Sequence, residues 1–171
     1  MKNLLTDEKY GFISRNDKDF ITAYTGAMKD MGYVHNGIEK YVCWGKYMIA
    51  YLKEGIKTKK YVSRFYLRDD GVIFRMYFTN IDFHREYIEN APEFIKSAFT
   101  GSQGDCRHCS NKCKDENGNC SHRKTYTIDE KAYEKCDGEV FLFENHETEN
   151  IPEYMKLLRE FYPAKKKTAS V

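Results

Sequence analysis

The sequence predicts an α+β protein: an antiparallel sheet of consecutive strands, flanked by helices and carrying a metal-stapled cysteine loop. Apolar residues with helical spacing and residues with period-two alternation occur in separate blocks along the chain. Strand-like blocks follow one another directly, which favours hairpins over the crossover connections of a doubly wound α/β fold. A glycine-rich phosphate loop of the kind that opens many doubly wound folds is also missing from the sequence.

The composition indicates an ordinary globular chain. Of its 171 residues, 41% are hydrophobic and 15% are aromatic, which is enough to build a core. We expect residues 1–163 to form one domain, with residues 164–171 as a flexible basic tail. The formal net charge of +2 gives no whole-molecule field for nucleic acid or membrane, so any basic surface must be local.

The N-terminal segment has no apolar run long enough for a signal peptide, and no stretch is long enough to span a membrane. The sequence therefore predicts a cytoplasmic protein without a membrane partner. Thiols stay reduced in that compartment, so the six cysteines favour metal or redox chemistry over disulfides.

The first half of the chain contains a helix and then strands. Residues 16–32 have helical spacing of apolar residues, with Asn16 as the expected N-cap. Residues 40–52 have the composition of a strand. Residues 61–80 alternate in the manner of a hairpin, with the Asp-Gly pair at 70–71 as a two-residue turn.

The second half returns to helical spacing at residues 82–101, where Pro92 should kink or split the helix. The cysteine loop follows, and then strand-like segments with the Asp-Gly pair at 137–138 as a further hairpin turn. Residues 151–163 form a final amphipathic helix. The expected short strands are residues 123–128, 131–136 and 139–144.

The loop GDCRHCSNKCKDENGNCSH has the pattern C-x2-C-x3-C-x6-C. Cys106 and Cys109 can bind one tetrahedral ion from a single tight turn. Cys120 follows the turn ENGN, which can bring it back to that first pair. The spacing leaves the fourth ligand open between Cys113, which is nearer in sequence, and Cys136, which lies at a predicted strand end.

Structural zinc is the predicted cofactor of this loop. Thiolates select zinc, and the polar residues between the cysteines form no core that would order the loop without a metal. The alternatives are an iron–sulfur cluster, whose usual cysteine orders differ from this one, and a set of free cysteines. His108 and His122 could each replace a thiolate, but we interpret them as solvated because enough cysteines are at hand.

The 61–80 hairpin is predicted to have two unlike faces. A turn at residues 70–71 places Arg64 opposite Tyr77 and leaves one face apolar. The other face interleaves arginines with tyrosines, and it carries Arg64, Tyr66, Arg68, Ile73, Arg75 and Tyr77.

An arginine–tyrosine face of this kind can bind phosphates and stack bases, or it can bind a small anionic or aromatic molecule. The alternative is an ordinary solvated face with cation–π neighbours, since antiparallel sheets commonly leave one face exposed to water. Trp44, the only tryptophan, is interpreted as a core or pocket-wall residue, and it joins the arginines and tyrosines as a candidate ligand-binding residue.

Three segments, EKYVCWGKYMIAY, FRMYFTNIDFHREYIENAPEFIKSAFTG and CSHRKTYTIDEKAYEKCDGEVFLF, resemble an uncharacterised bacterial family of small cytosolic α+β proteins. The resemblance implies that the cysteine loop is an insert and that a cysteine in the YEKCDG position is usual. It thereby favours Cys106, Cys109, Cys120 and Cys136 as ligands, with Cys113 as an extra thiol. The tryptophan-glycine strand is also similar to small α+β domains of the YjbR type, which lack the cysteine insert.

The predicted function is therefore that of a zinc-stabilised binding or regulatory module, with nucleic acid or a small anionic or aromatic molecule as ligand. The alternative is a small enzyme that uses a sheet-side pocket or a reactive thiol, although no nucleophile–base–orienter set can be assigned from the sequence. A helix over the arginine–tyrosine face would remove the binding site. A closed pocket beside Trp44 with convergent polar groups would favour the enzyme.

Overall fold

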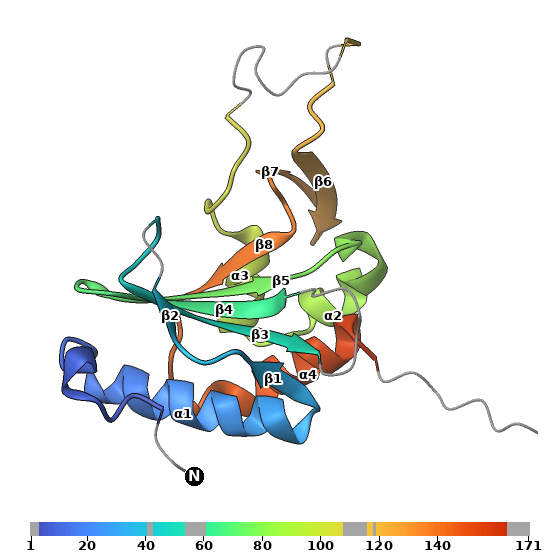
Figure 1. Cartoon of the computed structure of the whole chain (residues 1–171). Coiled ribbons are helices and arrows are strands. Elements are labelled where there is room, and N and C mark those ends of the chain that lie inside the picture. The colour runs from blue at the N-terminus through green and yellow to red at the C-terminus, as the bar shows by residue number, and fades with distance from the viewer. Residues whose placement is uncertain (1–3, 41–42, 54–60, 108–115, 118, 164–171) are drawn as a thin grey trace, which may run out of the picture.

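The computed structural model confirms the predicted α+β class with an antiparallel sheet (Figure 1). The predicted tail at 164–171 and residues 108–115 of the cysteine loop lie outside the described part of the chain. None of the helices that the structure describes is long and apolar enough to cross a membrane. The described residues are 4–40, 43–53, 61–107, 116–117 and 119–163.

The main sheet has the strand order β1-β3-β4-β5-β8, with β2 also paired to β3, and every pairing is antiparallel. Consecutive strands β3, β4 and β5 form its centre, as predicted, because each is joined to the next by a direct connection. The strands are β1 (Tyr33–His35), β2 (Glu39–Lys40), β3 (Tyr47–Lys53), β4 (Tyr61–Arg68), β5 (Gly71–Tyr77) and β8 (Val140–Phe143).

The predicted hairpin at Asp137-Gly138 is wrong. β6 (Arg123–Ile128) and β7 (Lys131–Cys136) pair only with each other as strands, in a separate two-stranded sheet. After Asp137-Gly138 the chain leaves β7, and β8 joins the main sheet beside β5. The backbone hydrogen bond from Phe78 N to Glu139 O, 2.9 Å long, lies where β8 meets β5.

Helices α1 (Arg15–Asp30) and α4 (Ile151–Phe161) lie on one side of the main sheet, below it in Figure 1. The N-cap of α1 is Ser14, two residues before the expected Asn16, because the Ser14 hydroxyl accepts a hydrogen bond from Asp17 N (3.1 Å). Pro92 splits the second predicted helix, residues 82–101, as expected. The remaining helical elements are η1 (Glu8–Tyr10), η2 (Ile81–His84), α2 (Arg85–Glu89), α3 (Glu93–Thr100) and η3 (Thr148–Asn150).

The core between the sheet and these helices is rich in aromatic side chains. Phe74 of β5 stacks on Phe65 of β4 with the ring centres 4.6 Å apart. Tyr24 of α1 and Tyr154 of α4 meet the Phe74 ring edge to face at 5.0 and 5.3 Å. All four side chains are fully buried, and edge-to-face contacts add to the stabilisation that burial alone provides.

Candidate functional site

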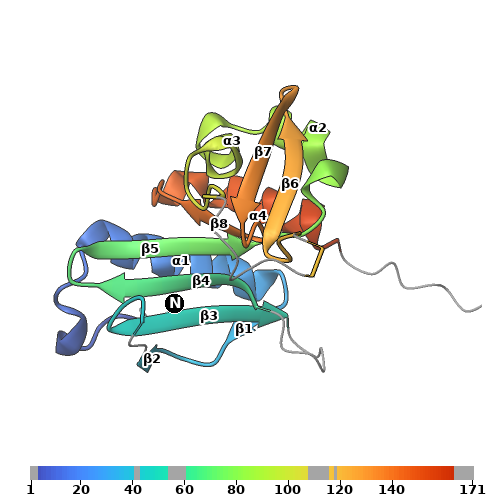
Figure 2. The same cartoon turned by 90° about the horizontal axis from the view of Figure 1, so that it is seen from above.

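The other side of the main sheet is open in the described part of the chain. Figure 2 shows β3, β4 and β5 from this side, with α1 behind them and the β6–β7 hairpin beyond β5 rather than over the strands. The residues predicted for the arginine–tyrosine face of the hairpin lie here. A helix over this face would have removed the predicted binding site. No described helix covers it.

The register of β4 and β5 differs from the predicted one by two residues. Arg64 lies opposite Arg75, and not opposite Tyr77. The reason is that the turn consists of Asp69 and Asp70, while Gly71 begins β5 with a φ of 130°, a conformation that favours glycine. Because side chains alternate along a strand, a shift of two residues leaves each of them on the predicted face.

Arg75 forms one of two arginine–aromatic stacks on the open face. Its guanidinium carbon lies 4.2 Å from the centre of the Trp44 ring and 5.7 Å from that of Tyr66. Tyr66 itself is only 2% exposed, so its ring supports the arginine from below and has little surface left for a ligand. Such cation–π contacts fix the plane of the guanidinium group.

Arg64 forms the second stack. Its guanidinium carbon lies 4.3 Å from the centre of the Tyr61 ring and 5.2 Å from that of Tyr77. Its Nη1 donates a hydrogen bond to the Tyr66 hydroxyl at 3.4 Å. Burial raises the pKa of Tyr77, so this phenol stays neutral beside the arginines and supplies no counter-charge.

Tyr61 was not predicted to lie on this face. Strict alternation would place it with Ser63 on the core side. An irregularity in the β3–β4 pairing, where Tyr51 pairs with Ser63 but Leu52 pairs with Tyr61, reverses that alternation at the start of β4. A bulge of this kind leaves no clear signal in the sequence, so the partner of Arg64 could be found only from the structure.

The two stacked arginines have no counter-ion among the described residues. Neither Arg64 nor Arg75 forms an ion pair with a carboxylate there, and Arg64 Nε is buried without a hydrogen-bond partner. Arg68, in contrast, donates from Nε and Nη2 to the two carboxylate oxygens of Asp70, at 2.7 and 2.6 Å. Arg68 is thereby neutralised, and the free positive charge of this face is concentrated at Arg64 and Arg75.

Trp44 is 46% exposed and therefore lines a pocket rather than the core. The chain turns between β2 and β3 where a continuous strand was expected, and Gly45 lets this turn approach β4. A Cβ atom at Gly45 would lie 2.7 Å from Leu67 O, so a larger residue could not be accommodated without a shift. Beside Trp44 is a surface concavity of about 780 Å³ whose lining includes Lys40 and Lys46.

Three of the predicted metal ligands lie near one end of the β6–β7 hairpin. Cys136 ends β7 opposite Arg123 of β6, and Cys120 O accepts a hydrogen bond from Arg123 N at 3.3 Å. Cys106 N donates to Glu134 O at 2.9 Å, next to the Asp105–Lys135 bridge. The backbone thus brings these cysteines to one region of the molecule from distant parts of the sequence.

A metal-stapled loop is nevertheless not supported by the residues that can be described. Among them, no group of three or more His, Cys, Asp or Glu side chains lies close enough together to hold a metal ion. The other two predicted ligands, Cys109 and Cys113, lie outside the described residues, as does His108.

A buried lysine, which sequence reasoning missed, binds residues 101–105. These residues form the stem of the cysteine loop. Lys135 of β7 is 2% exposed, and its Nζ donates to Gly101 O, to Gln103 O at 3.0 Å and to Asp105 Oδ1 at 2.5 Å. The three ammonium hydrogens therefore all have acceptors, which offsets the cost of burying the charge. The stem is attached to β7 by this lysine and needs no metal for that attachment.

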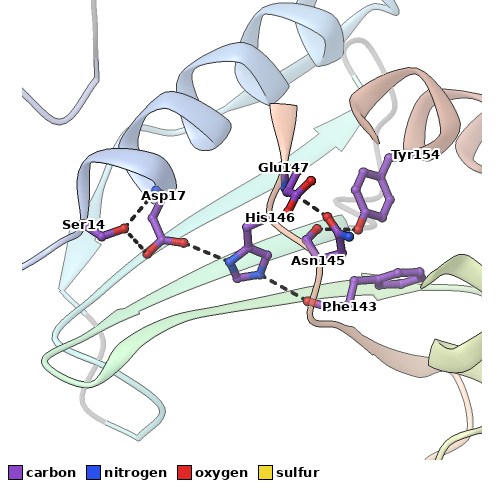
Figure 3. A network of polar contacts seen from close by, with 7 residues as sticks. All are labelled: Ser14, Asp17, Phe143, Asn145, His146, Glu147 and Tyr154. Atoms are coloured by element: carbon purple, nitrogen blue, oxygen red, sulfur yellow. Dashed lines mark hydrogen bonds and ion pairs between the residues drawn. The ribbon is translucent and has the colours of Figure 1, made fainter. Parts of the chain in front are cut away.

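A polar network around His146 contains a serine, an aspartate and a histidine, the residue types of a catalytic triad (Figure 3). His146 Nδ1 lies 2.9 Å from Asp17 Oδ1, and Ser14 Oγ donates to Asp17 Oδ2 at 2.7 Å. The carboxylate is thus in the middle, whereas a serine nucleophile needs the imidazole beside it as a base. The hydrogen bond with His146 holds the pKa of Asp17 below its usual value, and the network ties α1 to the β8–α4 connection.

Comparisons of the chain with models of protein families, with curated proteins and with solved structures found no match in any of the three. The resemblance to a bacterial α+β family and to YjbR-type domains therefore stays a prediction.

Proposed function

We propose that the protein is a binding module whose open sheet face binds single-stranded nucleic acid. The observation that carries this proposal is the pair of stacked arginines, Arg64 and Arg75, on an uncovered face without a carboxylate partner among the described residues. Single-strand binding proteins combine cations for the phosphates with aromatic rings on which bases stack. Trp44 supplies an exposed ring beside Arg75.

A small anionic molecule would use the same chemistry, and the concavity beside Trp44 offers space for one. Single-stranded nucleic acid is favoured because Arg64 and Arg75 lie on neighbouring strands of the open face, and the rings that contact them extend from Trp44 to Tyr77. An extended ligand can follow such a surface, whereas a small molecule would use only part of it. For the enzyme alternative, the serine–aspartate–histidine network around His146 lacks the contact between hydroxyl and imidazole that a serine nucleophile needs.

Single-stranded oligonucleotides should bind at about 50 mM salt and should quench the fluorescence of Trp44, the only tryptophan. The double change Arg64→Ala and Arg75→Ala should weaken binding. It should also flatten the slope of log K against log salt by about 0.7 for each phosphate of the single strand that the two arginines contact. Fluorescence titrations at several salt concentrations measure both the affinity and the salt slope.

The matched control is the double change Arg15→Ala and Arg159→Ala. It removes the same charge from exposed positions on α1 and α4, on the covered side of the sheet. This control should keep the affinity and salt slope of the unchanged protein. An unchanged protein that fails to bind at about 50 mM salt, or an Arg64/Arg75 variant that binds equally well, would contradict the proposal.

We also propose structural zinc in the cysteine loop, supported by the common location of Cys106, Cys120 and Cys136. The purified protein should carry about one zinc per chain by elemental analysis. Cys136→Ser should reduce zinc retention about as much as Cys106→Ser, whereas Cys113→Ser should be milder. Absence of zinc, or an absorption band typical of iron–sulfur clusters, would show that this assignment is wrong.

A further inference from the structure

Two arginines lie directly opposite each other at the centre of the open face. In the pairing of β3, β4, β5 and β8, Ala50 is the partner of Arg64, Arg64 of Arg75, and Arg75 of Leu142. This row across the sheet therefore carries two positive charges and no carboxylate. Like charges directly opposite in an antiparallel pair destabilise a sheet, so the row costs stability when no anion is present.

The aromatic contacts leave N–H donors at the edges of both guanidinium groups, although Arg64 Nη1 already donates to the Tyr66 hydroxyl. Trp44 and Tyr61 contact the arginines through their ring faces, at 4.2 and 4.3 Å, and stacking of this kind leaves the N–H groups at the edge of the guanidinium plane. Arg64 Nε has no acceptor among the described residues, but it is buried, so an anion on the open face would be bound through the Nη atoms of Arg64. A tetrahedral oxyanion can accept from such edges through several oxygens at once.

We infer that Arg64 and Arg75 together bind one phosphate group, which lies between them and relieves their mutual repulsion. The inference rests on the proposed function and specifies which part of the ligand occupies the centre of the face. The same chemistry fits a phosphodiester of a single strand and a free phosphate monoester. Arg68 does not take part, because Asp70 occupies its donor edge.

Inorganic phosphate is the probe for this site, and thermal unfolding is the measurement. At constant ionic strength, replacing chloride by phosphate at about tenfold above its Kd should raise the melting temperature by about 3–6 °C. Arg64→Gln and Arg75→Gln should each abolish most of this rise. In chloride alone, each variant should melt at or above the temperature of the unchanged protein, because the repulsion is removed.

The control variant Arg15→Gln with Arg159→Gln should keep the full phosphate effect. An equal rise in Arg75→Gln would show a general effect of phosphate on protein stability and would overturn the inference. Oligonucleotide binding that depends on both arginines, without any phosphate effect, would overturn the shared site and leave the proposed function standing. A phosphate effect that depends on both arginines, without oligonucleotide binding, would support the site, assign it to a free phosphate monoester and refute the proposed function.

Discussion

Replacing Phe74 by alanine should lower the free energy of unfolding by about 3–5 kcal/mol, the usual range for removing a fully buried phenylalanine. Phe74 contacts rings from both sides of the core: Phe65 on the sheet, Tyr24 on α1 and Tyr154 on α4. Its removal leaves a cavity that none of these large rings can fill without moving its neighbours. Urea unfolding followed by circular dichroism measures the change.

Phe83 provides the matched control, because it is 87% exposed in η2. Phe83→Ala should change the free energy of unfolding by no more than about 0.5 kcal/mol. Similar losses in the Phe74 and Phe83 variants would contradict the packing described here.

Replacing Lys135 by methionine should detach the stem of the cysteine loop from β7. The substitution keeps most of the side-chain volume but removes the donor for Gly101 O, Gln103 O and Asp105. Removal of the ammonium group leaves Gly101 O and Gln103 O without their donor, which costs about 1–3 kcal/mol, so exchange of the amide hydrogens in the stem should accelerate by roughly 5- to 150-fold. The reporters are the Cys106 and Cys136 amides, measured by hydrogen–deuterium exchange.

Lys131→Met makes the same chemical change on the same strand at an exposed position. It should leave the exchange of both reporter amides within about twofold of the unchanged protein, since exposed substitutions rarely exceed ~0.5 kcal/mol. If Lys135→Met also left the exchange unchanged, the stem would be held by something other than the lysine.

The local parts of the fold could be predicted from the sequence because local patterns determine them. The spacing of Phe20, Tyr24 and Met28 identifies α1, and Pro92 identifies the break between α2 and α3. The faces of the β4–β5 hairpin were also predictable, although its turn was misplaced. Side chains alternate between the two faces with a period of two residues, so an error of two residues in the pairing register leaves each side chain on the predicted face.

The parts that could not be predicted depend on contacts between distant segments. Asp137-Gly138 has the sequence of a hairpin turn, but the pairing of β8 with β5 is decided by where Phe141 and Phe143 can be buried. Trp44 was placed in a strand with a bulge at Gly45, because a glycine at this position indicates an irregularity but does not distinguish a bulge from the observed turn. That Arg64 and Arg75 have no carboxylate partner among the described residues likewise could be found only once the neighbouring strands were known.

The pairing of β5 with β8 has a consequence for the kinetics of folding. Strands β3, β4 and β5 can form from contacts that are close in sequence, whereas β8 must be brought back across residues 78–139. Contacts that are distant in sequence slow folding, because the entropy of closing the loop is lost before the contacts stabilise it. We therefore expect a late, rate-limiting step in which β8 and α4 dock. Until that step, β5 presents an unpaired edge and Phe74 lacks Phe143 and Tyr154, so aggregation of this intermediate competes with folding.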